Sequence, residues 1–362
     1  MNSEQLLNVT KAMKLEILNI LINSDLSNNK QAQKALLTIN DMFKRLDQSV
    51  EDVIPQETLN AYFSGVDEAT KALNKVGINP VNGLAASISS TGTVAGAFAT
   101  HVHMNAVSEI TDNTMLDLKA AIRTARQNTY FTLMTTLQGV KEDLQSGIIR
   151  GMSRKVITQR VAESFAKDGM TAFITVDGKQ LPLDFYSQVV TRTNLKQANT
   201  NGAINRYKEN GQDLVKISGN TPTCYECHAY RGMVFSLSGE DDRFPPAAGN
   251  LPPYHAQCQC SASVYVAEFK SDKEVNKEVE RAKTFDPTKD TRSESQKKAY
   301  EKQQRLNRQN NYEKKRYADI KGVLGDDAPA NLGAFKRMKR ANTDNYNKLI
   351  QDYQDALKSI KK

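Results

Sequence analysis

The strongest chemical signal in the sequence is a group of four cysteines and one histidine. Cys224 and Cys227 form a Cys-x-x-Cys pair, and His255, Cys258 and Cys260 follow after one intervening segment. A two-residue gap lets both thiolates of the pair bind one ion from a tight turn, and a hairpin between the two groups can return the second group to complete a tetrahedral site. Zinc fits these soft ligands best. The sequence therefore predicts a structural zinc site.

Two alternatives stay open at this site. Five candidate ligands compete for four places, so one of Cys258 and Cys260 is a spare thiol or lies beside the ligands, and His228 is a weaker sixth candidate. The cysteines could also be ordinary buried thiols.

The first residues lack the basic flank of a secretory signal peptide, which predicts synthesis in a cytoplasm. In that reducing compartment, clustered cysteines are metal ligands more often than disulfides.

The same motif does not predict catalysis. A catalytic zinc site needs an open coordination position and a general base, and the zinc deaminases, which also use a Cys-x-x-Cys, need a His-x-Glu upstream. His101 and His103 are followed two positions later by His103 and Asn105, so that element is missing. The sequence also contains no His-Glu-x-x-His, no P-loop and no nucleophile elbow. We expect a protein that is not an enzyme.

The excess positive charge lies in the last quarter of the chain. Residues 271–362 contain 23 Lys and Arg and 15 Asp and Glu, which leaves 26 of each sign in the first 270 residues. Such asymmetry predicts a neutral body with a basic arm that binds an acidic partner, most commonly nucleic acid, although a solvated helical face has a similar composition. No base-reading fold is recognisable, so we expect non-specific contact with DNA phosphates. The candidate residues for this contact are Lys314, Lys315, Arg316, Lys336, Arg337, Lys339 and Arg340.

Hydrophobic periodicity predicts an α+β fold that is predominantly α-helical. We expect a helical N-terminal region at 1–104, a helical core at 105–211, a β-rich zinc-binding module at 212–270 and a basic helical arm at 271–362. Short β-rich pieces in the module predict a small zinc-stabilised hairpin. Residues 76–108 carry no charged side chain and are too polar to cross a membrane, which predicts a flexible linker or a helix of small residues.

Local signals predict where several of these elements begin and end. The first hundred residues should form three helices, with Pro55 in the first turn of the third. Asp177-Gly178 predicts a turn, and Asp184 is expected to cap the helix that follows. A last helix carries an apolar stripe that must dock against another element, formed by Tyr346, Leu349, Ile350, Tyr353, Leu357 and Ile360.

The order of several short motifs resembles the head-morphogenesis, or minor capsid, proteins of tailed bacteriophages. The matching motifs are Asp177-Gly178, Leu183-Asp184-x-Tyr186, Arg192-Thr193, Gly211 to Ser218, Cys224-x-x-Cys227, Gly232-x-Val234-Phe235-Ser236, His255-x-x-Cys258-x-Cys260 and the polar helix from Tyr300 to Lys315. The resemblance covers roughly residues 120–320. The chain departs from the family at Ala256, where proline is common, and at Gln259, where a basic residue is common. Some members have histidine where this chain has Cys260.

The resemblance implies a low-copy structural protein at the portal vertex, inside the phage head. Its implied partners are the portal protein, with scaffold or major capsid protein as further candidates, and packaged double-stranded DNA that is bound without sequence specificity during packaging or delivery. Such a protein is made in the cytoplasm of the bacterial host and needs no membrane. Two alternatives stay open: a phage-derived effector or toxin enzyme, for which only residues 1–110 or the basic tail have room, and a DNA-binding protein that acts outside particles.

Overall fold

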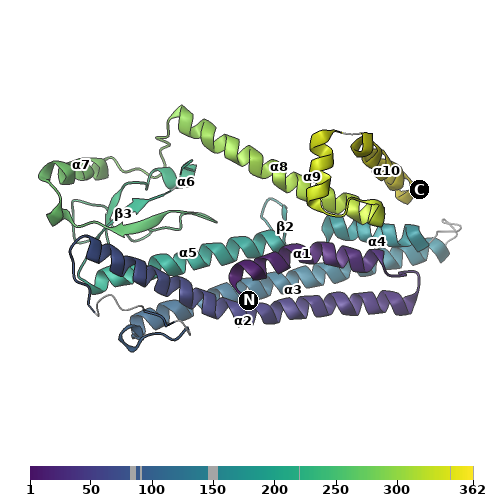
Figure 1. The fold of residues 1–362 in the computed structure, drawn as a ribbon, viewed down its shortest axis with the longest axis horizontal. Coiled ribbons are helices and arrows are strands. Elements are labelled where there is room, and N and C mark those ends of the chain that lie inside the picture. The colour runs from purple at the N-terminus through teal and green to yellow at the C-terminus, as the bar shows by residue number, and fades with distance from the viewer. Residues whose placement is uncertain (82–86, 90–91, 146–153, 220, 343, 362) are drawn as a thin grey trace.

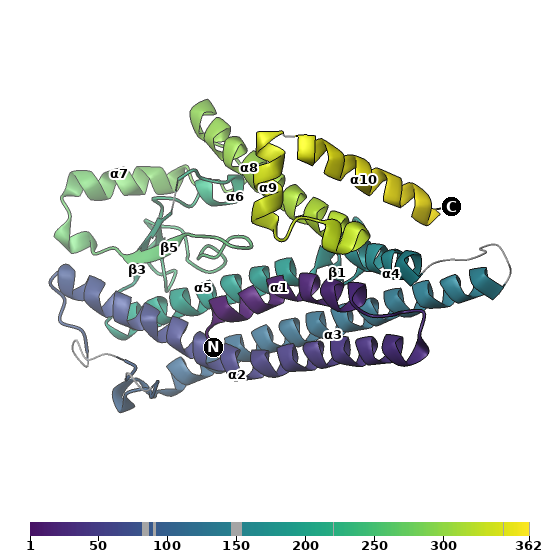
Figure 2. The same cartoon turned by 45° about the vertical axis from the view of Figure 1, so that its right-hand side comes forward.

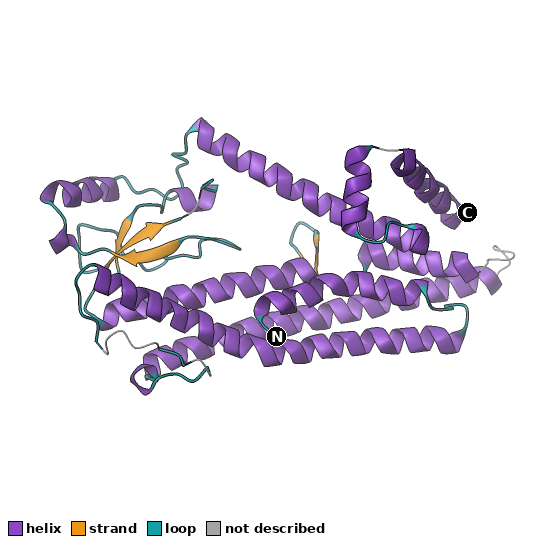
Figure 3. Ribbon diagram, viewed as in Figure 1, coloured by secondary structure: helices purple, strands orange, loops and turns teal. Residues whose placement is uncertain are grey.

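The computed structural model of the 362-residue chain describes residues 1–81, 87–89, 92–145, 154–219, 221–342 and 344–361. The described residues form a mostly helical, elongated molecule with two small antiparallel sheets, so the predominantly helical fold predicted from the sequence is confirmed (Figure 1). Long helices form a bundle, the larger sheet lies over one end of the bundle, and the last helices lie over the other end (Figure 3).

The bundle is formed by the first five α-helices. They are α1 (Ser3–Ile22), α2 (Asn29–Lys75), α3 (His101–Gln145), α4 (Arg154–Asp168) and α5 (Leu183–Glu209). α1 begins at a capping box in which Asn2 and Gln5 each accept the backbone N–H of the other. Leu6, Met13 and Ile17 of α1 are buried in the bundle core, at the seven- and four-residue spacing of one helix face.

The predicted helix boundary at Pro55 is wrong. α2 is one helix of 47 residues, and Pro55 lies inside it. An interior proline removes one N–H donor and costs about 3 kcal/mol. Val53 and Ile54 before the proline and Thr58 after it are buried, and each large apolar side chain removed from water contributes about 1.5–3 kcal/mol. Burial of a continuous face on both sides therefore outweighs the local cost.

α2 and α5 approach each other backbone to backbone. A Cβ atom at Gly65 of α2 would lie 1.9 Å from the carbonyl oxygen of Asn199, and one at Gly202 of α5 would lie 2.0 Å from the carbonyl oxygen of Tyr62. Real Cβ atoms do not occur at such distances, so only glycine fits at either position. The two glycines set how closely these helices pack.

The charge-free stretch between α2 and α3 is packed where the structure describes it. Ser87 is buried, and Phe98, in the 3-10 turn η1 (Gly96–Phe98), is buried beneath the guanidinium of Arg206, which lies 5.0 Å from the ring centroid. Arg206 is itself fully buried and donates to the hydroxyl of Thr70 at 2.9 Å. The described residues of this stretch before His101 form packed loops and this one 3-10 turn, and residues 101–108 are the start of α3. Residues 82–86 and 90–91 of the predicted linker lie outside the described residues.

A β-hairpin connects α4 to α5. Its strands are β1 (Thr171–Ile174) and β2 (Gln180–Pro182), and the predicted Asp177-Gly178 turn joins them. The predicted cap at Asp184 is wrong, because α5 begins directly after β2 and Pro182 takes the N-cap position. Proline supplies the extended backbone that this position needs. Asp184 lies in the first turn instead, where its carboxylate still favours the positive end of the helix dipole.

The predicted hairpin of the β-rich module is a three-stranded sheet. β3 (Leu214–Ser218) is the central strand and pairs antiparallel with β4 (Val234–Ser236) on one side and β5 (Ser261–Val264) on the other. β3 and β4 form an antiparallel pair, and β5 adds a third strand at the free edge of β3. Sheet residues share one apolar cluster with the last turns of α2 and α5, which include Leu73, Ala203, Ile204 and Tyr207.

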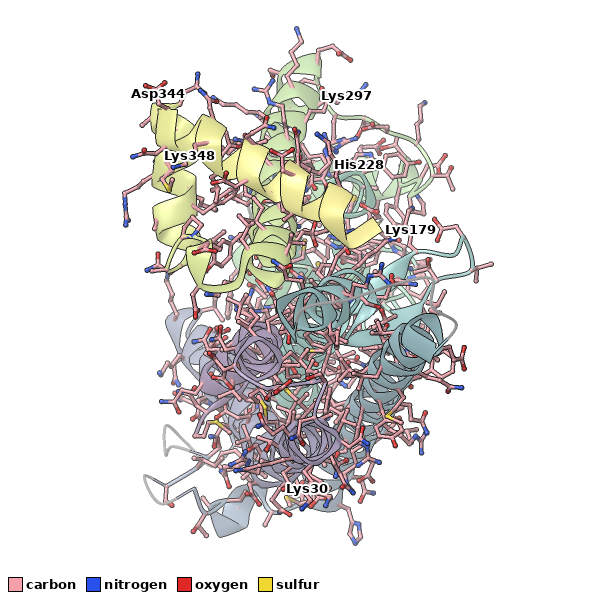
Figure 4. The ribbon with its side chains drawn as sticks, turned by 90° about the vertical axis from the view of Figure 1, so that its right-hand side faces the viewer. Lys30, Lys179, His228, Lys297, Asp344 and Lys348 are labelled. Atoms are coloured by element: carbon pink, nitrogen blue, oxygen red, sulfur yellow. The ribbon has the colours of Figure 1, made fainter. Side chains whose placement is uncertain are left out.

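The C-terminal helices return from the sheet to the bundle. They are α7 (Asp272–Lys283), α8 (Glu294–Leu324), α9 (Leu332–Ala341) and α10 (Asp344–Lys361), and α8 spans most of the distance (Figure 2). In an end-on view, Asp344 and Lys348 of α10 lie on the opposite side of the molecule from Lys30 of α2 (Figure 4).

The predicted stripe on the last helix docks. Leu349 and Tyr353 of α10 are buried against α8 and α9, where Phe335 is fully buried. α8 in turn packs on α4, and Gln159 donates to the carbonyl oxygen of Val323 at 2.8 Å. The basic arm is therefore attached to the helical bundle.

The close approach of α2 and α5 predicts the effect of one methyl group. Gly65→Ala should destabilise the protein by about 3 kcal/mol, because the new Cβ forces the two helix backbones apart. Gly139→Ala on α3 is the matched control. A Cβ there meets nothing within 4 Å, and replacing a helical glycine by alanine stabilises by about 0.5–1 kcal/mol. Urea unfolding measures both, and equal effects of the two substitutions would contradict the packing.

Candidate metal centre

The predicted ligands come together from two turns beside the sheet. Cys224 and Cys227 lie at the short helix α6 (Tyr225–His228) that follows β3, and the sulfur of Cys224, the N-cap, accepts the N–H of Cys227 at 3.3 Å. His255, Cys258 and Cys260 lie in the segment that leads into β5. All four cysteines are buried free thiols, and His255 is half-buried.

The ligand atoms form two overlapping groups that share Cys227. Nε2 of His255 lies 3.1 Å from the sulfurs of both Cys224 and Cys227, and the sulfur of Cys227 lies 3.6 Å from that of Cys258. The sulfur of Cys260 lies within 4.8 Å of those of Cys227 and Cys258. Around tetrahedral zinc, two sulfurs lie about 3.8 Å apart, and a sulfur and a nitrogen about 3.6 Å apart. The two groups share only Cys227, so Cys258 lies more than 4.8 Å from at least one donor of the first group, and the cluster would have to close by about 1 Å to surround such an ion.

The orientation of His255 suits a metal ligand. Its Nδ1 lies 2.7 Å from the carbonyl oxygen of Ala256. Because a carbonyl only accepts hydrogen bonds, Nδ1 donates to it, and Nε2 faces the sulfurs, where a metal ion would replace its proton. Metal-binding histidines are commonly held in this way by a hydrogen bond from the other ring nitrogen.

The sulfurs compete for protons. A hydrogen bond from Cys227 lowers the pKa of the Cys224 thiol to about 5, and hydrogen bonds from Cys227 and Cys260 lower the pKa of Cys258 to about 2. The pKa of Cys227 is raised because its thiol donates to Cys224. The hydrogen bond with Cys224 also raises the pKa of His255 to about 9. Crowded thiolates repel one another, and a divalent cation relieves this repulsion by binding to them and to Nε2 in place of the protons.

Cys258 and Cys260 both lie in one group with Cys227, and we propose Cys258 as the fourth ligand. The sulfur of Cys258 contacts Cys227 and also accepts the backbone N–H of Cys260 at 3.4 Å, as metal-bound thiolates commonly do. Cys260 packs against Gly219, where a Cβ would lie only 2.8 Å from its sulfur. We infer that Cys224, Cys227, His255 and Cys258 form the ligand set and that Cys260 supports it.

The sixth candidate, His228, is engaged elsewhere. Its Nε2 lies 2.7 Å from the carbonyl oxygen of Lys289 and 3.0 Å from the backbone nitrogen of Thr291. Neither of the two ligand groups contains it. His228 therefore attaches the segment between α7 and α8 to α6.

The predicted phosphate-binding residues lie on α8 and α9, away from the sheet that carries the cysteines (Figure 1). Buried Glu313 lies 2.9 Å from the ammonium of Lys339 and 3.5 Å from that of Lys336, and the guanidinium of Arg316 lies 4.5 Å from the ring centroid of Tyr353. These three cations help to hold the C-terminal helices together. The exposed members of the set are Lys314, Lys315, Arg337 and Arg340.

Sequence reasoning did not identify Glu313. Its partners come from α9, across a turn, and no spacing in the sequence pairs that one carboxylate with those two lysines. It also missed the carbonyl of Ala256 that orients His255, since every residue carries a backbone carbonyl.

Comparison with known proteins identifies the family. Residues 30–359 match the family model described as phage minor capsid protein 2. The chain belongs to this family. The resemblance stated from the sequence motifs is thereby confirmed, and the family assignment makes this minor capsid protein a component of the virion. Neither the curated proteins nor the solved structures gave a match.

Within the described part of this minor capsid protein, every helix is too short or too polar to span a bilayer.

The cluster predicts a metal content for the purified minor capsid protein. We expect about one zinc ion per chain, and we expect chelation to unfold the sheet module, because structural zinc supplies about 10–16 kcal/mol of folding free energy in small modules. His255→Ala and Cys258→Ser should each strongly lower the zinc content, whereas Cys260→Ser should retain it. Elemental analysis after dialysis measures the content.

His101→Ala is the matched control for the histidine substitution. His101 is exposed and lies outside both ligand groups, so this variant should keep its zinc. Loss of zinc from Cys260→Ser, with retention in Cys258→Ser, would reverse the assignment of the fourth ligand. If the wild-type protein keeps its fold without zinc, it has no structural metal site.

Glu313 predicts a pH-dependent contact between α8 and α9. The hydrogen bond from Lys339 lowers the pKa of Glu313 below its usual 4.5. The carboxylate therefore contributes stability above pH 4.5, and this contribution is lost as the pH falls through the lowered pKa. Glu313→Gln should speed hydrogen exchange of α9 at pH 7 and should have a smaller effect near pH 3.

Glu301→Gln, on an exposed part of α8, is the control for this substitution and should leave exchange unchanged. If Glu313→Gln has an equally large effect at both pH values, the effect comes from packing and not from charge.

Proposed function

We propose that this minor capsid protein is a structural component of the phage head, without enzymatic activity, that is bound at the portal vertex and contacts the packaged DNA. The family match over residues 30–359 carries this proposal. Three features support it: a buried cluster of possible metal ligands, an exposed apolar hairpin and an uneven distribution of charge.

The ligand cluster supports a structural zinc ion. Catalytic zinc keeps one coordination position open for water or substrate, whereas structural zinc is closed by four protein ligands. Here five donors surround the site, and all four sulfurs are buried. We propose that zinc holds the α6 turn and the turn before β5 together, so that its binding free energy stabilises the sheet module.

The β1–β2 hairpin offers a surface for a protein partner. Phe173 and Ile174 of β1 are 46% and 57% exposed, and Val176 at the turn is fully exposed. Adjacent exposed apolar side chains are typical of protein–protein interfaces. We propose that this hairpin contributes to the contact with the portal protein.

The charge distribution supports contact with DNA. The net positive charge resides in residues 271–362, and Lys314, Lys315, Arg337 and Arg340 are exposed on α8 and α9. Exposed Lys and Arg release counterions from DNA on binding, which gives affinity without sequence specificity. This set of cations is suited to a nucleic-acid surface inside the head.

Incorporation into heads tests the proposal. The double variant Ile174→Ser/Val176→Ser should fold normally, because both side chains are exposed, but should be strongly reduced in purified heads. Leu37→Ser, which replaces a side chain 59% exposed on α2, is the matched control and should be incorporated normally. Quantitative mass spectrometry of heads measures the copy number. Normal incorporation of the hairpin variant would remove the hairpin from the proposal, and absence of the wild-type protein from heads would overturn the proposal as a whole.

A further inference from the structure

A polar pocket lies beside the metal centre. Its volume is about 390 Å³, and the residues that line it include three arginines: Arg231 after α6, Arg281 on α7 and Arg292 before α8. The other lining residues are Thr223, His228, Gly232, Thr291 and Gln296. No acidic side chain and no large apolar side chain is among them. The side chains that line the pocket therefore supply mainly hydrogen-bond donors and positive charge.

The charge of one of the three arginines, Arg292, is paired with a carboxylate, and its side chain is held in place. Arg292 donates twice to the carboxylate of Asp290, from Nε and Nη2, each at 2.9 Å, and these hydrogen bonds hold the pKa of Asp290 well below its usual range. The guanidinium also lies 5.8 Å from the ring centroid of Tyr225 and 5.7 Å from that of Tyr300. Arg292 is thus part of the pocket wall, with its charge already paired.

The other two arginines lack an ion-pair partner among the described residues. Arg281 donates from Nη2 to the carbonyl oxygen of Arg231 at 2.5 Å, and Arg231 donates from Nη1 to the hydroxyl of Thr223. These neutral acceptors hold the side chains in position but do not compensate their charge. A guanidinium has five N–H donors, so most donors of both residues stay available. Arg231 is half-buried and Arg281 is exposed, and both line the same pocket, where their positive charges favour an anion.

A glycine allows this arrangement. Gly232 has φ of 76°, in the left-handed region, and a Cβ there would lie 2.6 Å from Nη1 of Arg281. The guanidinium of Arg281 therefore lies directly over the glycine backbone. Any other residue at position 232 would displace it and strain the turn.

We propose that this pocket binds a phosphate group through Arg231 and Arg281. A tetrahedral oxyanion accepts bidentate hydrogen bonds from several guanidinium forks at once, and phosphate carries enough charge to neutralise both. The inference depends on the proposed function only for the source of the phosphate, which is the DNA backbone in the head. The chemistry of the pocket itself would also bind free phosphate.

Binding of inorganic phosphate tests the pocket directly. Full-length, zinc-loaded protein should bind phosphate saturably in isothermal titration calorimetry, and Arg231→Gln/Arg281→Gln should weaken this binding at least tenfold. Arg305→Gln/Arg308→Gln removes the same number of charges from exposed positions of α8 and should leave phosphate binding unchanged. Equal loss in both double variants, or no binding by the wild type, would overturn the proposal. The zinc content and circular dichroism of each variant must match those of the wild type. Arg231→Lys/Arg281→Lys keeps the charge but loses the planar guanidinium donors, and it should also bind phosphate more weakly.

Binding of a short double-stranded DNA identifies the source of the phosphate. Each lost phosphate contact lowers the slope of log affinity against log salt by about 0.9, so the pocket variant should lose roughly one to two slope units. An unchanged slope, together with lost binding of inorganic phosphate, would assign the pocket to a free phosphate and overturn its role in DNA contact. The copy number in heads, measured separately, reports on the portal proposal, so the two failures are distinguishable.

Discussion

The close contact between α2 and α5 is the constraint on which the rest of the structure depends. Gly65 and Gly202 let the two backbones meet, and no larger residue fits at either position. Beyond this contact, the last turns of both helices form the surface on which the three-stranded sheet packs, and Leu73 and Tyr207 share an apolar cluster with the four cysteines. The position of the metal centre therefore follows from the packing of two helices that contribute no ligand to it.

The cluster of cysteines and His255 joins this packing to the loops of the sheet module. Its two turns are short, and the helix between the first pair of ligands has only four residues, so local structure alone gives them little stability. The hydrogen bond between His255 and the carbonyl of Ala256 and the N–H of Cys260 directed at Cys258 orient the donors before an ion arrives. Preorganisation of this kind suits a site whose proposed role is to hold a module together.

The Lys and Arg side chains of this protein have two roles, and the amino-acid composition does not distinguish them. Some cations of the C-terminal region are structural: Lys336 and Lys339 neutralise Glu313, and Arg316 covers Tyr353. Others are exposed, or, as with Arg231 and Arg281, gathered in a pocket without a carboxylate partner. The positions of the cations that lack a carboxylate partner indicate where a phosphate can bind. The total number of cations does not.

The sequence by itself determined the ligand types and their spacing, the helical periodicity, the turn at Asp177-Gly178 and the excess of positive charge, because each depends on residues close together in the chain. It also carried the family resemblance. Only the tertiary structure decided that α2 continues through Pro55, that β5 joins β3 to make a sheet and that Glu313 meets its lysines. These outcomes depend on burial and pairing between distant segments, whose free energies outweigh local preferences and leave no periodic pattern in the sequence.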